Sequence, residues 1–163
     1  MKHAGLSVTA GIFGFLAAVA SVALPTGSAI ADGGFRGASY VTTVRDSNGN
    51  FASRGVITLH ADQTMSVIDS GQGGPTFFFS SQLGSWEPSG TGRAVGRTID
   101  FDYPNSEGGA EVARLNYTIS FAHAGHQIAG TIILTAFPLQ GNPLDGGGTV
   151  AGTFTFTGDL ITP

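Results

Sequence analysis

The stretch "EVARLNYTISFAHAGHQIAGTIILTAF", Glu111 to Phe137, consists of two alternating runs separated by a short turn. The first run places large apolar side chains at every second position, namely Leu115, Tyr117, Ile119 and Phe121. A period of two sends alternate side chains to opposite faces of a β-strand, and Ala124-Gly125 suits a turn. The stretch therefore predicts two antiparallel strands, 111–123 and 127–137, that each bury one face.

The chain on either side of this hairpin repeats the pattern, with β-branched and aromatic runs cut by Gly, Asn, Asp and Pro. The six further strands that we expect are 40–45, 51–60, 65–69, 83–87, 94–103 and 149–161. The connections are mostly short, so neighbours in sequence should pair antiparallel. Eight such strands favour an all-β, eight-stranded antiparallel up-and-down β-barrel, because closure leaves no open edge. A two-sheet β-sandwich is the alternative.

The alternation also predicts which side chains face the barrel interior. In the strand 94–103 the expected inner face holds Val95, Arg97, Ile99, Phe101 and Tyr103. Asp100 and Asp102 then fall on the outer face, where both would be solvated and ionised. In the last strand the expected inner face holds Val150, Phe154, Phe156 and Leu160. Apolar residues inside and polar ones outside are typical of a soluble barrel, whereas an outer-membrane barrel reverses the pattern.

The first 31 residues have the order of a secretory signal peptide. A weakly basic start at Lys2 and His3 precedes the apolar run Gly11–Leu24, and small residues at Ala29 and Ala31 suit cleavage. The apolar run is shorter than the roughly 17–25 residues that span a bilayer, which argues against the alternative of a membrane anchor. We expect cleavage after Ala31, one domain over residues 32–163, a secreted or periplasmic location and no stable membrane insertion.

The composition of the expected mature chain excludes several functions. With Lys2 removed, six arginines stand against 11 acidic residues, so a nucleic acid or an anionic membrane is an unsuitable partner. The chain has no cysteine, which excludes thiol catalysis and zinc sites with cysteine ligands. The histidines His60, His123 and His126 lie at turns, and we interpret them as solvated rim residues. We therefore expect no metal and no cofactor.

Several segments together carry a resemblance that spans nearly the whole expected mature chain. They are "VITLHADQTMSV", Gly84-Ser85-Trp86, "GRTIDFDY", "GHQIAGTIILTAF" and "GTVAGTFTFTGDLI". The chain resembles small secreted bacterial proteins of largely unassigned function, whose expected fold is similar to the calycin and allene oxide cyclase type of barrel. Lipocalins carry their G-x-W at the start of the barrel, whereas Trp86 falls in the fourth expected strand. No family catalytic motif matches, so the resemblance implies no catalytic residue.

An eight-stranded barrel encloses just enough room for side chains or one small ligand. Our leading hypothesis is that the interior binds a small apolar or amphipathic molecule. Phe77, Phe78 and Phe79 follow a glycine-rich loop, so we expect this segment to close one end of the barrel as a lid. The aromatic residues that we expect to contact the ligand are Phe77, Phe78, Phe79, Trp86, Phe101, Tyr103 and Phe121.

Two other functions stay open at this point. The first is a cyclase or isomerase acting on a hydrophobic substrate, with Arg97, Tyr117 and Asp69 as the candidate catalytic groups. These three share the expected inward parity, and a buried guanidinium needs an anion or several acceptors nearby. The second is a packed structural barrel with no ligand.

The signal peptide yields a direct prediction. Because the "AIA" ending precedes Asp32, the exported protein should begin at Asp32. Mass spectrometry of the exported chain measures this terminus. An exported chain that still carries Met1 would contradict cleavage and favour the anchor.

Overall fold

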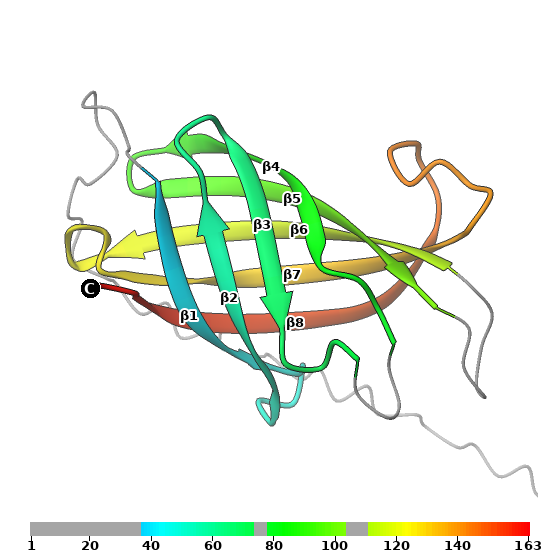
Figure 1. Cartoon of the computed structure of the whole chain (residues 1–163), viewed down its shortest axis with the longest axis horizontal. Coiled ribbons are helices and arrows are strands. Elements are labelled where there is room, and N and C mark those ends of the chain that lie inside the picture. The colour runs from blue at the N-terminus through cyan, green and yellow to red at the C-terminus, as the bar shows by residue number, and fades with distance from the viewer. Residues whose placement is uncertain (1–36, 74–77, 104–110) are drawn as a thin grey trace, which may run out of the picture.

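The computed structural model describes residues 37–73, 78–103 and 111–163. The expected signal peptide and Phe77 lie outside these residues. The described chain folds into a closed antiparallel barrel in which the strands follow one another in sequence order (Figure 1). The predicted up-and-down barrel is therefore confirmed, and the sandwich alternative is wrong. No helix among the described residues has the length and apolar character needed to cross a membrane.

The strand boundaries agree closely with those expected from the sequence. The strands are β1 (Ala38–Arg45), β2 (Phe51–Leu59), β3 (Thr64–Asp69), β4 (Gln82–Gly90), β5 (Arg93–Asp102), β6 (Glu111–Ala122), β7 (Gln127–Pro138) and β8 (Thr149–Leu160). A short 3-10 turn, His123–Gly125, joins β6 to β7. The largest difference is in β4, which continues beyond Glu87 to Gly90.

The barrel closes because β1 pairs with both its sequence neighbour and the last strand. Tyr40 lies opposite Ile57 of β2 on one side and Leu160 of β8 on the other. The remaining strands pair in order, so each strand has two hydrogen-bonded neighbours. Closure of this kind removes the exposed edges that would otherwise pair with another chain.

One end of the barrel, next to the β6–β7 turn, is filled by side chains. The Trp86 indole donates a hydrogen bond to the His60 carbonyl at 2.9 Å, and the Tyr40 hydroxyl donates to the Gly125 carbonyl at 2.9 Å. The rings of Tyr40 and Phe121 pack edge to face, with centroids 6.4 Å apart. Burial raises the pKa of Tyr40 to about 12, so its hydroxyl stays protonated and continues to donate.

The predicted inner faces are correct for β6 and for most of β8. Leu115, Tyr117, Ile119, Phe121 and Phe156 are buried. The prediction for Val150 is wrong, because its side chain is 63% exposed. The register of β7 and β8 shifts between Leu134 and Thr135, where Gly152 and then Val150 are the successive partners. Such a bulge adds one residue and reverses the alternation beyond it.

The predicted face of β5 is inverted. Ala94, Thr98 and Asp100 are buried, whereas Phe101 is 49% exposed and Arg97 is exposed. Gly96 lies opposite Trp86 in the register, and a Cβ at this position would be 2.7 Å from the Met65 sulfur. The interior at this point is filled by the large Trp86 and Met65 side chains, so a residue larger than glycine would have to displace the Met65 side chain. The small Gly96 thus faces the packed interior, which is the reverse of the assignment from apolar alternation.

The inward and outward positions of β4 give a matched stability test. Trp86→Ala should lower the free energy of unfolding by about 3–5 kcal/mol, because it removes a buried ring from the packed end. Leu83→Ala should change it by less than about 0.5 kcal/mol, because Leu83 is 66% exposed on the outer face. Urea denaturation followed by circular dichroism measures both. Equal losses in the two variants would contradict the assigned faces.

Candidate functional site

A cavity of about 650 Å³ occupies the barrel end opposite the Trp86 indole, and all eight strands contribute to its wall. Much of the wall is apolar, with Val44, Ile57, Val67, Leu115, Ile132, Leu134 and Phe154. The polar lining includes Thr42, Ser53, Asp69, Gln82, Asp100, Asp102, Glu111 and Tyr117. The cavity therefore combines an apolar wall with a concentration of carboxyl groups.

The topology explains why the acidic residues meet at one end of the barrel. β3 ends at Asp69, β5 ends at Asp102, and β6 begins at Glu111. In an antiparallel barrel, the ends of odd strands and the beginnings of even strands lie at the same end. Asp100 lies two residues before Asp102 and so shares its face, one step deeper in the barrel.

Asp100 is the most deeply buried of these acids, with only 3% of its surface exposed. Its Oδ1 atom has no hydrogen-bond partner among the described residues. Burial, followed by the nearby charges of Asp102 and Asp69, raises the pKa of Asp100 to about 7. This carboxyl group therefore changes its protonation near neutral pH, unlike an ordinary aspartate.

Two neighbouring carboxyl groups complete the acidic region. Burial raises the pKa of Asp102, and the charge of Glu111, its partner in the β5–β6 register, adds to the shift. Asp69 is held in place by local hydrogen bonds. The Ser53 hydroxyl donates to its Oδ2 at 2.7 Å, and the Gly71 amide donates to its Oδ1 at 2.7 Å.

A buried hydrogen-bond network forms the floor beside Asp100. The Gln82 side-chain carbonyl accepts hydrogen bonds from the Tyr117 hydroxyl at 2.6 Å and from the Thr98 hydroxyl at 3.0 Å. Burial raises the pKa of Tyr117 well above its ordinary value, so its hydroxyl remains a donor. These bonds fix the orientation of Gln82, because both hydroxyl groups point their protons at the same oxygen.

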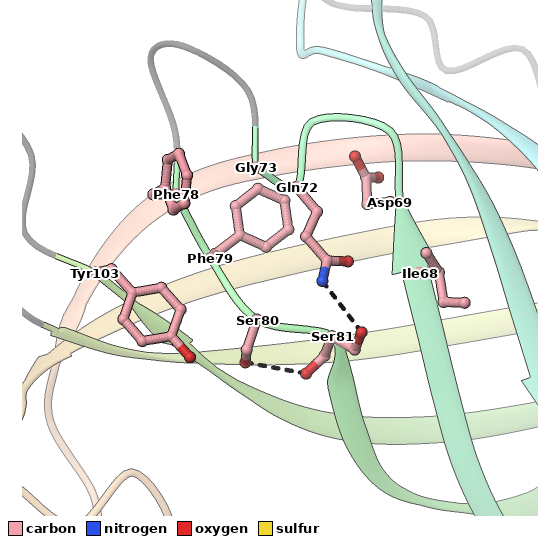
Figure 2. Close-up of a pocket in the computed structure, with 9 residues that line it drawn as sticks. All are labelled: Ile68, Asp69, Gln72, Gly73, Phe78, Phe79, Ser80, Ser81 and Tyr103. Carbon is pink, nitrogen blue, oxygen red and sulfur yellow. Dashed lines mark hydrogen bonds between the residues drawn. The ribbon is translucent and has the colours of Figure 1, made fainter.

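The mouth of the cavity is formed by Gly71, Phe78, Phe79 and Tyr103. Figure 2 shows a shallow outer pocket at this mouth. The rings of Phe78, Phe79 and Tyr103 lie on one side of it, and Ile68 and Asp69 of β3 lie across from them. The Ser80 amide donates to the Phe101 carbonyl at 3.0 Å, and the Tyr103 amide donates to the Phe78 carbonyl at 2.7 Å. The segment Phe78–Ser80 is thus paired with the end of β5, which positions Phe79 opposite Asp102.

The structure brings together only some of the residues that the sequence suggested. Asp69, Tyr117, Phe78, Phe79 and Tyr103 line the cavity. The other predicted residues that it describes lie elsewhere: Trp86 and Phe121 in the packed end, and Phe101 and Arg97 on the outer face. Arg97 donates to the Asn116 side chain at 2.9 Å, so the predicted buried cluster of Arg97 with Tyr117 and Asp69 is wrong.

Sequence reasoning missed Asp100, Asp102, Glu111 and Gln82 as lining residues. The signal that could have found the acids was their position along the chain, at the ends of β3 and β5 and the start of β6. Within the described ranges, no group of three or more His, Cys, Asp or Glu side chains is arranged to hold a metal ion. His123 and His126 flank the β6–β7 turn, at the end away from the cavity.

The comparisons with known proteins add no family to this description. The chain matches no protein-family model, and the searches of curated proteins and of solved structures likewise give no match.

The burial of Asp100 predicts a specific pH dependence of stability. Its folded pKa lies above its unfolded value, so the folded state holds the proton more tightly and loses stability as the pH rises from about 4 to 7. Asp100→Asn removes this loss. The free energy of unfolding of the variant, relative to the natural chain, should increase over that range by about 1–4 kcal/mol and then level off.

Thermal or urea denaturation at pH 4, 5.5, 7 and 8 measures the difference. Asp145→Asn is the control, because Asp145 is exposed in the β7–β8 loop. Because this side chain lies outside the cavity, the control should not reproduce the change seen for Asp100→Asn. A pH-independent difference for Asp100→Asn would contradict a raised Asp100 pKa.

Proposed function

We propose that this barrel binds one small amphipathic molecule in the cavity lined by all eight strands. The observation that carries the proposal is a cavity of about 650 Å³ whose apolar wall surrounds the deeply buried Asp100. Sites for small molecules typically have about 300–1,000 Å³, mostly apolar walls and a few polar groups that fix orientation. The cavity has each of these properties.

The arrangement of polar and apolar groups favours an amphipathic ligand over a purely apolar one. Leu115, Ile132 and Phe154 offer apolar surface, while Asp100 and Gln82 form a polar floor. A purely apolar molecule would cover these polar groups without a hydrogen bond, which costs free energy. The resemblance to calycin and allene oxide cyclase barrels is consistent with the proposal, since barrels of this size hold one small ligand. The expected signal peptide would place the binding outside the cytoplasm.

An isomerase or cyclase is the second candidate, and the near-neutral pKa of Asp100 favours it. A general acid or base works best when its pKa is close to the operating pH. With Arg97 on the outer face, proton transfer would depend on Asp100, with Tyr117 and Gln82 orienting the substrate. Both candidates require the cavity to be occupied, so occupancy is tested first. The packed structural barrel is disfavoured by the size of the cavity.

Two substitutions on β7 test occupancy. Ala136 lines the cavity, so Ala136→Phe should fill part of it and weaken binding of the neutral fluorescent probe N-phenyl-1-naphthylamine by about tenfold or more. Ala129 does not line the cavity and lies on the same strand, so Ala129→Phe is the control and should bind as the natural chain does.

Fluorescence titration gives the dissociation constants, and circular dichroism establishes that each variant keeps its β structure. Probe binding that is absent from the natural chain would overturn the proposed function. Equal binding by both folded variants would show that the probe binds outside the cavity, and would overturn it as well.

A further inference from the structure

We infer that the polar group of the ligand is a cation, an organic ammonium group attached to a hydrophobic body. This inference rests on the proposed function and adds the chemical class of the ligand. The ammonium group would lie among Asp69, Asp100 and Asp102, and the hydrophobic body would pack against the apolar wall.

The charge of the cavity is the first argument. Asp69, Asp100, Asp102 and Glu111 line it, and no lysine, arginine or histidine of the described residues does so. The described arginines nearest in sequence to Asp100, Asp102 and Glu111 bond elsewhere. Arg97 donates to the Asn116 side chain, and Arg114 donates to the Pro143 and Asp145 carbonyls. The negative charge inside the barrel therefore has no basic partner among the described residues.

The unsatisfied oxygen of Asp100 is the second, independent argument. Nearly all buried polar atoms in proteins have a hydrogen-bond partner, so an exception calls for an explanation. Asp100 Oδ1 is buried without a partner among the described residues, on a side chain that lines the cavity. In the ionised form of Asp100 this oxygen only accepts hydrogen bonds, so the partner missing from that form is a donor. An ammonium group supplies up to three donors and a compensating charge.

The neighbouring hydroxyl groups do not supply that donor. The Tyr117 and Thr98 hydroxyls both donate to Gln82, and the Ser53 hydroxyl donates to Asp69. An anionic ligand would meet carboxylates at the polar floor and be repelled by them. A metal ion is disfavoured, since the described acidic side chains form no group arranged to hold one.

A cationic ligand would also change the protonation of the site. The ionisable groups that line the cavity with Asp100 are Asp102 and Tyr103 at the end of β5, Asp69 on β3, and Glu111 and Tyr117 on β6. A nearby positive charge favours the ionised form of a carboxyl group and lowers its pKa. Binding of the cation should therefore release a proton from Asp100, and the affinity should increase as the pH rises from 5 to 8.

A matched series of ligands tests the inference. Decylamine, decanol and decanoate share one alkyl chain and differ in carrying a positive charge, no charge or a negative charge at neutral pH. Each is used to displace N-phenyl-1-naphthylamine from the natural chain at pH 7.5 and low ionic strength. We expect decylamine to bind at least tenfold more tightly than decanol, and decanoate to bind most weakly. The double variant Asp100→Asn/Asp102→Asn should lose this preference, measured as the ratio of the affinities for decylamine and decanol, whereas Asp145→Asn should keep it.

The outcomes separate this inference from the function on which it rests. Failure of the probe and of all three ligands to bind would overturn the proposed function. Binding of all three with similar affinity would leave the function standing and overturn the cation inference. The inference would also be overturned if the double variant kept the preference for decylamine, or if the affinity for decylamine did not rise with pH in the natural chain.

Discussion

The pairing of β1 with β8 is the constraint on which the rest of the structure depends. Once Tyr40 and Leu160 are paired, the sheet is closed and every strand has a fixed inner and outer face. A single residue can then change faces only through an irregularity such as the bulge near Val150. Closure thereby determines which polar side chains of the strands are brought inside, whatever their preference for water.

Asp100 shows the energetic consequence of that constraint. A carboxyl group would ordinarily remain in water, but the position of Gly96 opposite Trp86 fixes the β5 face that contains it. Burial disfavours the charged form, and the cavity supplies no cation among the described residues to offset this. A group held in an unfavourable environment by the surrounding fold is typical of a functional site. The buried Asp100 carboxyl group therefore reduces the stability of the fold, and the same group would hold a ligand.

The fold could be predicted from the sequence because it depends on short-range signals. Alternation and turn residues located every strand, as in β6 and β7, where Ala124-Gly125 marks the turn. The site depends on long-range packing, which alternation does not report. In β5 the bulky apolar side chains lie on the outer face, so Val95, Ile99 and Phe101 suggested an apolar inner face that the structure does not have. The outer position of Arg97 follows from the same error. Asp69 was placed correctly, because Met65 and Val67 in β3 leave no such ambiguity.

In the part of the chain that the structure describes, side chains around Trp86, Tyr40 and Phe121 fill one end of the barrel, and the cavity opens at the other end beside Phe79 and Tyr103. A small molecule that bound in the cavity as proposed would enter and leave through this opening. Association and dissociation of such a ligand would thus cross the same barrier beside Phe79 and Tyr103. A larger side chain at this opening, outside the position of the bound ligand, would slow association and dissociation together. The residence time would then change while the equilibrium affinity stayed the same. The two ends of the barrel would therefore have separate roles. The packed end limits the depth of the cavity, and the open end limits the rates at which a ligand associates and dissociates.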